Sequence, residues 1–404
     1  MLMHIDKGSA NGIVSAPPSK SMAHRLLICA AMAKGVSHIN GISECEDVSA
    51  TLDCLRALGI QAEKNGSTVT VTGQSIAECS PSAPLFCKES GSTLRFFIPI
   101  ALVSGKNTIF YGADSLMKRP MSVYKELCER DGLVYIEDGT SIAVKGPLKP
   151  GNYSVVGNIS SQFISGLLFA LPVLNDDSRI KIIPPIESKS YIELTIAALS
   201  IFGVKVEWED EHTLFIKGNQ HYVPCDIEVE GDYSGAAFTD ALNLFGGEVE
   251  VLRLNPASLQ GDKSYKKFYE MLNKGVPTIH IGNCPDLGPI LFAVAAAKHG
   301  GVFTGTKRLK IKESDRAEAM ATELKKFGTS VTVYDDKVVV YPAAFHAPSE
   351  LLHGHNDHRI VMALSVLLSL TGGDIAGAEA VKKSYPAFFE DLKKLGIGVC
   401  EYDY

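Results

Sequence analysis

Basic residues stand at the start of several apolar stretches of helical length in this sequence. A helix N-terminus has free N–H groups and a partial positive charge, so acidic residues and bound anions are favoured there. The segments that instead place Lys or Arg at such a start are 17–25, 89–95, 118–120, 312–316, 356–359 and 382–386. Because this departure recurs in a chain of net charge −7, we infer one shared function, the binding of one or two anionic ligands by helix N-termini and guanidinium groups.

Hydroxyl and amide side chains accompany these basic residues. Ser21 and Arg25 are four residues apart on one predicted helix and therefore face the same way. Ser160, Ser161 and Gln162 come directly before another apolar helix. On this local pattern, contact with a ligand and a plain helix N-cap are equally good interpretations of Ser160.

Two acidic residues could carry protons among these cations. Asp286 precedes the apolar run 290–297, where an ordinary helix cap is the favoured alternative. Glu313 lies between Lys312 and Arg316, where a structural ion pair is the alternative. An acid held between cations can transfer a proton to a bound ligand, while the cations stabilise negative charge on that ligand.

Composition and motifs exclude or disfavour several other functions. Lys and Arg total 39 and Asp and Glu total 46, which argues against a general nucleic-acid binder. The nine cysteines include no C-x-x-C pair, so we expect reduced, mostly buried thiols rather than a disulfide framework or a zinc ribbon. The sequence has neither a P-loop nor a G-x-S-x-G elbow. His353, His355 and His358 lack partners at metal-ligand spacing, and we expect a solvated loop there.

We expect a protein that neither crosses a membrane nor is secreted. No apolar run reaches the roughly 18–20 residues of a membrane span. Asp6 and Lys7 interrupt the apolar region that a signal peptide would need. The length of 404 residues predicts two or three domains at roughly 150 residues each.

A supersecondary unit recurs along the chain and must position these residues. In each copy a helix ends near a glycine, which adopts a left-handed helix end without a Cβ clash, and strands around a turn usually follow. The glycines are Gly59, Gly132, Gly203, Gly275, Gly328 and Gly396. The predicted hairpins lie at 60–73, 133–146, 204–218 and 329–341, after a first strand at 3–14. Six units predict an α/β protein with three units in each of two lobes and a boundary near 228–233. The alternative is two unrelated α/β domains with coincidental spacing.

The motifs in these loops together resemble the 5-enolpyruvylshikimate-3-phosphate synthase family of enolpyruvyl transferases. They occur in family order over nearly the whole chain, as APPSKSMAHR, SGSTLRF, RPM, SSQFISGLL, KIKESDR, NDHRIVMAL and SYPAFFEDL. The resemblance implies a two-lobed fold of six βαβαββ units with the active site in the cleft between the lobes. It also places the N-terminal strand in the second lobe, so the expected lobes are 19–229 and 1–18 plus 230–404.

The activity that the resemblance implies is that of a 3-phosphoshikimate 1-carboxyvinyltransferase, in the shikimate pathway of aromatic amino-acid biosynthesis. Such an enzyme transfers the enolpyruvyl group of phosphoenolpyruvate to the 5-hydroxyl of shikimate 3-phosphate and releases phosphate, through a tetrahedral intermediate. The family cycle needs no metal and no organic cofactor. Both substrates carry a phosphate and a carboxylate, which meets the demand for anionic ligands. We expect a monomeric, cytoplasmic enzyme of bacterial type with no nucleic-acid or membrane partner.

The resemblance implies roles for individual residues as well. Those expected to face phosphoenolpyruvate are Lys20, Gly91, Arg95, Arg119, Gln162, Arg316, Arg359 and Lys383. Those expected to hold shikimate 3-phosphate are Ser21, Arg25, Ser160, Ser161, Gln162, Ser188, Tyr191, Asp286 and Lys312. Asp286 is expected to accept the hydroxyl proton, and Glu313 to protonate the vinyl carbon and later remove a methyl proton. Lys20 is the other candidate proton donor.

Four positions depart from the family pattern and bear on affinity rather than on the reaction class. They are Glu89, Ser190, Gly235 and Arg308. Glyphosate occupies the phosphoenolpyruvate site in sensitive members of the family. Because Gly91 leaves room for it, we expect this protein to be sensitive.

Three alternatives remain at this point. The first is the sister enzyme that uses UDP-N-acetylglucosamine, which commonly has a Cys in the loop before its Arg-Pro pair; the loop 111–120 has none. The second is a non-catalytic phosphometabolite-binding protein, which loss of Asp286 or Glu313 would favour, and both are present. The third is an RNA-phosphate enzyme, which the charge balance disfavours.

Overall fold

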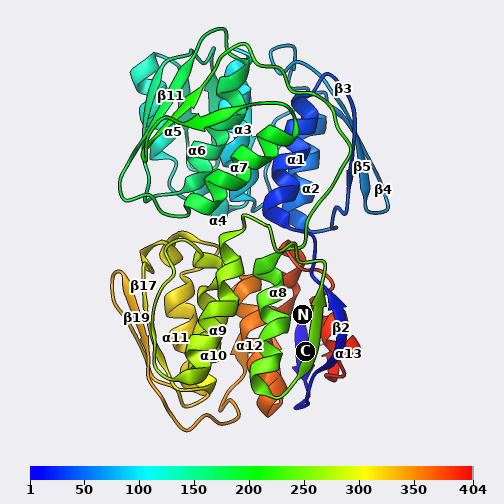
Figure 1. Cartoon of the computed structure of the whole chain (residues 1–404), viewed down its shortest axis with the longest axis vertical. Coiled ribbons are helices and arrows are strands. Elements are labelled where there is room, and N and C mark those ends of the chain that lie inside the picture. Colours follow the sequence, from blue (N-terminus) through cyan, green and yellow to red (C-terminus); the bar gives the residue numbers. More distant parts are fainter. Residues whose placement is uncertain (403–404) are drawn as a thin grey trace. The chain divides into compact units, whose positions relative to one another are not determined.

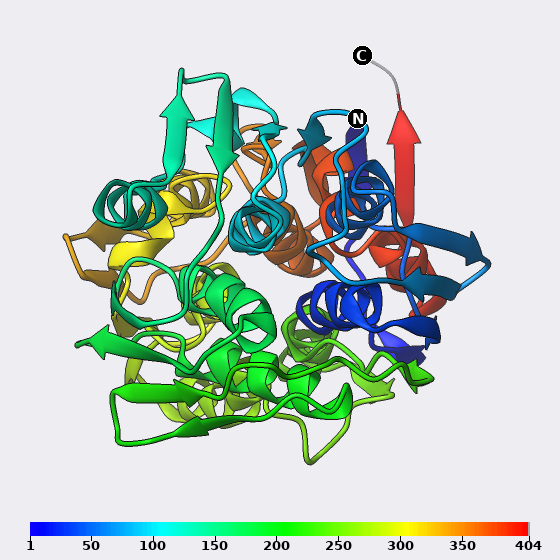
Figure 2. The same cartoon turned by 90° about the horizontal axis from the view of Figure 1, so that it is seen from above.

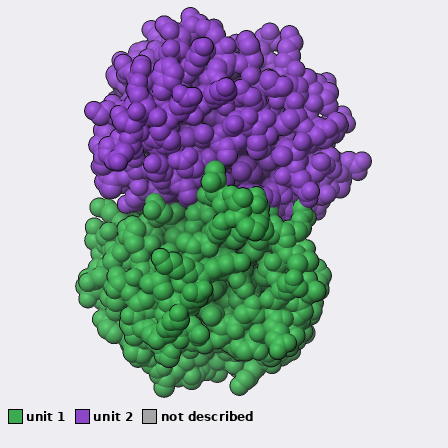
Figure 3. Space-filling view, viewed as in Figure 1, with its two compact units in different colours: residues 1–17, 231–404 green, residues 18–230 purple. Residues whose placement is uncertain are grey.

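Two hydrophobic cores form from different parts of the chain. The structure is a computed structural model and describes residues 1–402. One core belongs to unit 2, Pro18–Glu230, and the other to unit 1, which combines Met1–Pro17 with the chain from Gly231 onward (Figure 3). The lobes expected from the sequence differ from these units by one residue at each crossing. Residues 403–404 of the expected second lobe lie outside the described part.

Unit 2 has its most apolar helices at its centre. α3 and α6 are buried along nearly their whole length and pack against each other, as expected for helices that are apolar on all sides. The helices of this unit are α1 (Lys20–Met32), α2 (Glu46–Ala57), α3 (Gly91–Val103), α4 (Asp114–Met117), α5 (Ser122–Asp131), α6 (Ser161–Ala170), α7 (Lys189–Ile201) and the 3-10 helix η1 (Leu171–Val173). Figure 1 shows α1, α3, α6 and α7 side by side, and Figure 2 shows strands of this unit toward its rim.

Three sheets of unit 2 share one pattern, in which a parallel pair of strands is extended by an antiparallel hairpin. The strands are β3 (Gly35–Asn40), β4 (Gln61–Asn65), β5 (Thr68–Gly73), β6 (Leu85–Phe86), β7 (Thr108–Tyr111), β8 (Val134–Glu137), β9 (Ser141–Lys145), β10 (Asn152–Val156), β11 (Ser178–Ile183), β12 (Val206–Trp208), β13 (Thr213–Ile216) and β14 (Ile227–Glu228). The sheet orders are β14-β3-β5-β4, β6-β7-β9-β8 and β10-β11-β13-β12. Buried and exposed residues alternate along β11, which turns one face of its sheet toward the core.

Unit 1 repeats this organisation. Its helices are α8 (Tyr233–Asp240), α9 (Tyr265–Lys274), α10 (Gly288–Ala297), α11 (Arg316–Lys326), α12 (His358–Thr371) and α13 (Phe388–Lys394), with the 3-10 helices η2 (Ala241–Phe245), η3 (Gly261–Ser264), η4 (Pro285–Leu287), η5 (Lys307–Ile311) and η6 (Ala378–Lys383). Its strands are β1 (Leu2–Ile5), β2 (Asn11–Ser15), β15 (Glu248–Leu252), β16 (Thr278–His280), β17 (Gly301–Thr304), β18 (Val331–Val333), β19 (Lys337–Val340), β20 (Leu352–His353), β21 (Gly373–Ala376) and β22 (Val399–Tyr402). The sheet orders are β16-β17-β19-β18, β20-β21-β1-β22 and the pair β15-β2.

The predicted α/β class and the predicted hairpins are confirmed. Hairpins occupy 61–73, 134–145, 206–216 and 331–340. Four sheets have the full parallel-plus-hairpin pattern. In the sheet β20-β21-β1-β22 the antiparallel strands β1 and β22 are far apart in sequence, and the sixth sheet keeps only the parallel pair of β15 with β2. Six sheets, three in each unit, correspond to the six predicted repeats.

One detail of the prediction was wrong. The first strand, expected over 3–14, is two strands, β1 and β2, in different sheets. Asp6–Ser9 between them is polar and contains Gly8, so the alternation needed for one long strand is broken there.

All nine cysteines, which lie within residues 1–402, are free thiols, and seven of them are buried. Burial is expected for small apolar side chains. Among residues 1–402, no helix is long and apolar enough to span a membrane.

Candidate active site

Gly91 begins α3 at a point where three polar side chains of unit 2 converge. A Cβ atom at this position would lie 2.9 Å from Arg119 Nη1 and 3.6 Å from both Arg95 Nη1 and Gln162 Oε1. Arg95 Nη1 donates to Gln162 Oε1 at 2.7 Å, and Gln162 Nε2 donates to Ser92 Oγ at 2.9 Å. The glycine therefore keeps the first turn of α3 accessible beside two guanidinium groups.

Arg119, in the loop between α4 and α5, has donors that the protein does not use. Its Nε and Nη2 are buried and have no hydrogen-bond partner among the described residues. Leaving buried charged donors unpaired is costly. An anion that accepts from Arg119 would remove this cost, which makes the surroundings of Gly91 a candidate anion site.

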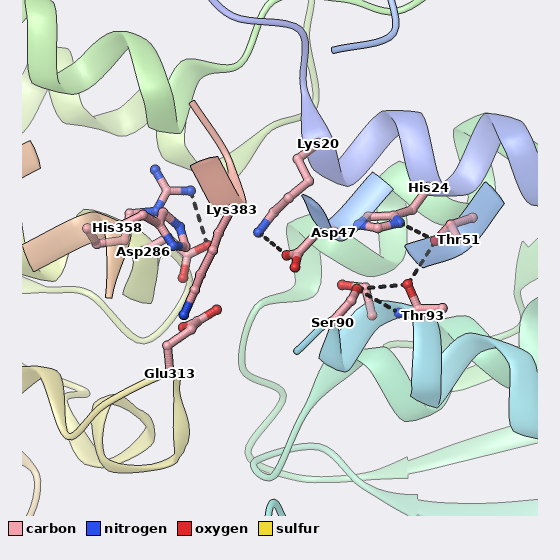
Figure 4. Close-up of polar contacts among 12 residues, drawn as sticks. Lys20, His24, Asp47, Thr51, Ser90, Thr93, Asp286, Glu313, His358 and Lys383 are labelled. Carbon is pink, nitrogen blue, oxygen red and sulfur yellow. Dashed lines mark hydrogen bonds and ion pairs between the residues drawn. The ribbon is translucent and has the colours of Figure 1, made fainter. Parts of the chain in front are cut away.

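Lys20 is the first residue of α1 and faces the N-terminal end of α2. Its Nζ donates to Asp47 Oδ2 at 2.7 Å, and both side chains are largely buried (Figure 4). Ser19 caps α1 by accepting from Met22 N. α1, α3 and α6 have no acidic residue in their first turns, so their N-terminal partial positive charge is not neutralised locally.

Arg25 is held inward by neutral groups of α1, α6 and α7. Its Nε donates to Thr195 Oγ1 at 2.8 Å, and Nη2 donates to the Tyr191 carbonyl at 3.0 Å. Nη1 donates to the Ser21 carbonyl at 2.6 Å. Burial lowers the pKa of Arg25 to about 10. At neutral pH it remains a cation. Its hydrogen-bond partners within residues 1–402 are neutral, so Arg25 raises the local potential for an anion bound nearby.

Ser160, Ser161, Ser188 and Tyr191 lie at the starts of α6 and α7, which pack against each other. Ser160 does act as the N-cap of α6, accepting from Gln162 N at 3.3 Å. Ser188 has φ 55° and ψ 40°, a left-handed conformation that is unfavourable for a serine. Backbone strain of this kind is retained where surrounding structure fixes it, frequently at functional sites.

In unit 1, three acidic side chains converge on Arg316, the first residue of α11. Arg316 donates to Asp286 Oδ1, to Glu313 Oε2 and to Asp357 Oδ2, each at 2.8 Å, and is 1% exposed. Asp286 also accepts from Lys312 Nζ at 3.1 Å. The arrangement fixes Asp286 in η4 and Glu313 beside α11 by charge-assisted hydrogen bonds.

The pKa values of Arg316 and Lys312 are shifted in opposite directions. Burial acts to lower the pKa of Arg316, but the carboxylates of Asp357, Glu313 and Asp286 outweigh it and hold the pKa well above its ordinary value. The pKa of Lys312 is lowered by burial and by Arg316 and Arg308, against an opposing effect of Asp286 and Glu313. Arg316 is therefore a permanent cation, whereas Lys312 loses its proton at a lower pH than an ordinary lysine.

Arg359 and Lys383 complete this cluster. Arg359 Nη2 lies 3.6 Å from Asp286 Oδ2, while its buried Nε and Nη1 have no hydrogen-bond partner within residues 1–402. Lys383 Nζ donates to the Asn356 carbonyl at 2.7 Å and is 5% exposed. Unit 1 therefore also has a buried guanidinium with donors that an anion could use.

Two local interpretations from the sequence need correction, and a third is confirmed. Asp286 was expected, on the favoured alternative, to cap a helix, but Leu287 is the N-cap of α10 and Asp286 binds cations instead. The ion pair of Glu313 with Arg316, given as an alternative, is present. His358 was expected in a solvated loop, but it lies on α12 and is 1% exposed. Apolar residues follow His358 on α12, and the first turn of this helix is buried together with them.

Sequence reasoning missed residues that hold the cations in place. Asp357 caps α12 by accepting from Arg359 N, and its carboxylate also pairs with Arg316. Asp47 and Thr195 fix Lys20 and Arg25. Asp357 had a detectable signal, an acid directly before His358-Arg359 at a helix start, whereas Asp47 and Thr195 had none because their partners are remote in sequence.

The departure at Gly235 has a packing reason. A Cβ atom there would lie 2.6 Å from Pro17 Cγ and 3.7 Å from the Tyr385 ring. A serine at this position would require Pro17 to shift.

Among residues 1–402, no group of three or more His, Cys, Asp or Glu side chains could hold a metal ion.

Comparison with known proteins gives one consistent result. A family model described as EPSP synthase (3-phosphoshikimate 1-carboxyvinyltransferase) matches residues 6–392. The chain is 39% identical over 414 residues to the 3-phosphoshikimate 1-carboxyvinyltransferase of Clostridium perfringens, covering 97% of both chains. It is 38% identical over 424 residues to that of Clostridium kluyveri, covering 98% of both. A solved structure of EPSP synthase from Acinetobacter baumannii has the same fold, with a TM-score of 0.80 at 24% identity over 99% of this chain and 100% of that one.

Proposed function

Since this chain belongs to the EPSP synthase family of 3-phosphoshikimate 1-carboxyvinyltransferases, we propose that the basic clusters of its two units serve one reaction. That reaction transfers the enolpyruvyl group of phosphoenolpyruvate to shikimate 3-phosphate and releases phosphate, in the shikimate pathway of aromatic amino-acid biosynthesis. The UDP-N-acetylglucosamine alternative is not favoured, because the family model and the curated relatives name the shikimate enzyme.

The observation that carries the assignment of residues is a pair of arginines, one in each unit, whose guanidinium groups have buried nitrogens with no acceptor among residues 1–402. Arg119 and Arg359 each have two buried guanidinium nitrogens without an acceptor among residues 1–402. We assign both to the anionic groups of phosphoenolpyruvate. The other residues assigned to it are Lys20, Gly91, Arg95, Gln162, Arg316 and Lys383.

Shikimate 3-phosphate is assigned to the starts of α1, α6 and α7 together with two residues of unit 1. The assigned residues are Ser21, Arg25, Ser160, Ser161, Gln162, Ser188, Tyr191, Asp286 and Lys312. Hydroxyl groups at helix starts suit a phosphate and a polyol. Arg25 contributes charge rather than geometry, since its Nε, Nη1 and Nη2 all donate within the protein.

Asp286 and Glu313 divide the proton transfers in this proposal. Asp286 accepts the proton of the 5-hydroxyl as that oxygen adds to C2 of phosphoenolpyruvate, and Glu313 delivers a proton to C3, which becomes a methyl group. In the second half Glu313 removes a methyl proton while the C2–O bond to phosphate breaks, so the enol ether and phosphate form. Arg316 binds both carboxylates at 2.8 Å, which orients them for these steps.

The remaining parts of the proposal concern the whole chain. We assign the active site to a cleft between the two units, treated as the two lobes of the family fold, and no metal or organic cofactor to the cycle. We also assign the protein to the cytoplasm as a monomer. Size-exclusion chromatography with light scattering tests the monomer, and a dimer peak would contradict it.

The function is tested by phosphate release from phosphoenolpyruvate with each acceptor in a separate assay. Release with shikimate 3-phosphate, and none with UDP-N-acetylglucosamine, is expected. Asp286→Asn and Glu313→Gln should abolish release while keeping the circular dichroism spectrum, because both replacements keep the side-chain volume. Release only with the nucleotide sugar would assign the chain to the sister enzyme. Release with neither acceptor, from folded protein, would favour a binding protein.

A further inference from the structure

Two polar contacts link α1 and α2 of unit 2 one helical turn apart. On α1, Lys20 and His24 are separated by four residues, as are Asp47 and Thr51 on α2. Lys20 Nζ donates to Asp47 Oδ2 at 2.7 Å, and His24 Nδ1 lies 2.7 Å from Thr51 Oγ1 (Figure 4). The outer contact involves a residue assigned to phosphoenolpyruvate, whereas the inner one belongs to no assigned role.

The inner contact continues to the start of α3. Thr51 Oγ1 lies 2.8 Å from Thr93 Oγ1, which in turn donates to Ser90 Oγ at 2.8 Å. Ser90 Oγ also accepts from Thr93 N at 3.2 Å and so caps α3 directly before Gly91. The four side chains His24, Thr51, Thr93 and Ser90 have no exposed surface. We call these four residues the buried chain.

Hydrogen counting gives the buried chain one direction. The hydroxyl hydrogen of Thr93 is used on Ser90, so Thr93 accepts from Thr51. The hydroxyl hydrogen of Thr51 is then used as well, and Thr51 must accept from His24 Nδ1. His24 therefore has a proton on Nδ1, and in a neutral ring this is the only ring N–H. Burial, together with Lys20 and Arg25, lowers the pKa of His24 well below its ordinary value, which agrees with a neutral ring.

Packing alone does not explain a histidine here. His24 Nε2 is buried and has no hydrogen-bond partner within residues 1–402, a cost that a leucine in the same space would avoid. What a leucine could not provide is the hydrogen bond of Nδ1 with Thr51. This hydrogen bond is directional, whereas apolar contacts between helices tolerate small shifts. Directional contacts that link two helix starts are suited to fixing their relative position.

We propose that His24 is a positioning residue whose buried chain through Thr51, Thr93 and Ser90 fixes Lys20 relative to Gly91 and thereby sets the affinity for phosphoenolpyruvate. The proposal rests on the assignment of Lys20 and Gly91 to that substrate under the proposed function. No residue of the buried chain contacts a reacting atom in this proposal.

The decisive variant is Thr51→Val. It keeps the shape of the side chain and removes the hydroxyl in the middle of the buried chain. We expect KM for phosphoenolpyruvate to rise about tenfold, because small displacements of binding groups have large kinetic effects. KM for shikimate 3-phosphate should rise much less, because only Ser21 and Arg25 of its assigned residues share a helix with the buried chain, whereas the others lie on α6, on α7 or in unit 1. Thr51→Ser restores the hydroxyl and should restore KM for phosphoenolpyruvate.

Thr108→Val is the matched control. Thr108 lies on β7 of the same unit, is 1% exposed, and its hydroxyl has no hydrogen-bond partner in the described chain. Thr108→Val removes a buried hydroxyl but leaves every hydrogen bond of the buried chain intact. Both KM values should therefore equal those of the wild type. If Thr51→Val instead lowers only the amount of active protein and leaves both KM values unchanged, the hydroxyl is merely structural and the proposal is wrong.

A measurement on the wild-type protein keeps the proposal testable even if Thr51→Val does not fold. Nitrogen-15 NMR of histidine-labelled protein should show one buried ring protonated on Nδ1 only, and His24→Asn should remove that signal. Because the Asn amide can donate in place of Nδ1, His24→Asn should keep KM for phosphoenolpyruvate near the wild-type value, whereas His24→Leu should raise it. A ring protonated on Nε2 would overturn the direction of the chain.

Failure of this inference can be told apart from failure of the proposed function. If wild-type protein releases no phosphate with shikimate 3-phosphate, the proposed function fails. If the wild type is active but Thr51→Val and His24→Leu bind phosphoenolpyruvate as the wild type does, only the positioning role fails.

Discussion

Arginines with buried guanidinium nitrogens have two different uses in this protein, and their partners distinguish them. Arg316 is surrounded by three carboxylates at 2.8 Å, so its charge is compensated within the protein. Arg119 and Arg359 retain buried donors without acceptors in the described chain. The first use orients acidic groups, and the second prepares a place for an anion.

The space beside Gly91 gives a prediction for substrate affinity. A Cβ atom there would lie 2.9 Å from Arg119 Nη1, so Gly91→Ala must displace that guanidinium. We expect Gly91→Ala to raise KM for phosphoenolpyruvate and to weaken inhibition by glyphosate, with little change in thermal stability, because the displaced group is the end of a flexible side chain.

Steady-state kinetics with and without glyphosate measure this effect, and Gly139→Ala is the control. Gly139 lies in the turn between β8 and β9, and a Cβ atom there would meet nothing within 4 Å, although its φ of 84° makes alanine strained. Gly139→Ala should therefore affect stability without changing inhibition. Full activity of the wild type in millimolar glyphosate would contradict the assignment of Gly91.

Lys312 gives a prediction for pH dependence. Burial and neighbouring cations lower its pKa, so its positive charge is lost as the pH rises through a value below that of an ordinary lysine. Affinity for shikimate 3-phosphate should therefore fall on the alkaline side. In Lys312→Arg the fall should move to higher pH, since a guanidinium stays protonated. Titration calorimetry at several pH values measures it, and the same alkaline limit in both proteins would exclude Lys312 from the site.

At the scale of elements, unit 1 depends on Arg316 to connect η4, α11 and the start of α12. Arg316→Met would leave Asp286, Glu313 and Asp357 without their shared cation. Breaking a buried ion pair by removing one partner costs about 3–5 kcal/mol, and we expect a loss of unfolding free energy of that order together with loss of activity. Denaturation in urea, followed by circular dichroism, measures it.

Arg179→Met is the matched control for Arg316. Arg179 pairs with Glu209 at the surface, where both side chains are 45% exposed, and surface pairs contribute little. Equal destabilisation by the two substitutions would show that burial of the three-carboxylate cluster does not matter.

Local patterns explain which elements could be predicted. The four hairpins were predictable because period-2 strands around a polar turn, with a glycine in the turns at Gly66 and Gly139, are signals within one short segment. The division of residues 3–14 between β1 and β2 was not, because each strand pairs with a segment far away in sequence, β22 and β21 in one case and β15 in the other. The same reason hid Asp47 and Thr195, whereas the basic helix starts were visible directly.

The resemblance to a family contributed what spacing could not. Spacing indicated an anion site but not which unit holds each of its residues. The fold places Lys20 and Arg95 in unit 2, and it places Arg316 and Lys383 in unit 1. Asp286 shows the limit of local reasoning, since a position suited to a helix cap was used for binding cations instead.

At the scale of the whole molecule, one site assigned to two units must admit its substrates and then enclose them. We expect small-angle X-ray scattering to show a smaller radius of gyration when shikimate 3-phosphate and glyphosate are both present. Phosphate buffer of matched ionic strength is the control for non-specific charge effects. An unchanged scattering curve at saturating ligand would argue against closure.

The central claim is that one cationic residue from each unit acts on the same phosphoenolpyruvate. The most direct measurement is single-turnover release of phosphate by Arg119→Ala, in unit 2, and Arg359→Ala, in unit 1, with Arg179→Ala as a surface control. We predict that each of the first two slows release by at least about 100-fold, while the control keeps the wild-type rate. Wild-type release by either Arg119→Ala or Arg359→Ala, in folded protein, would contradict a site shared by the two units.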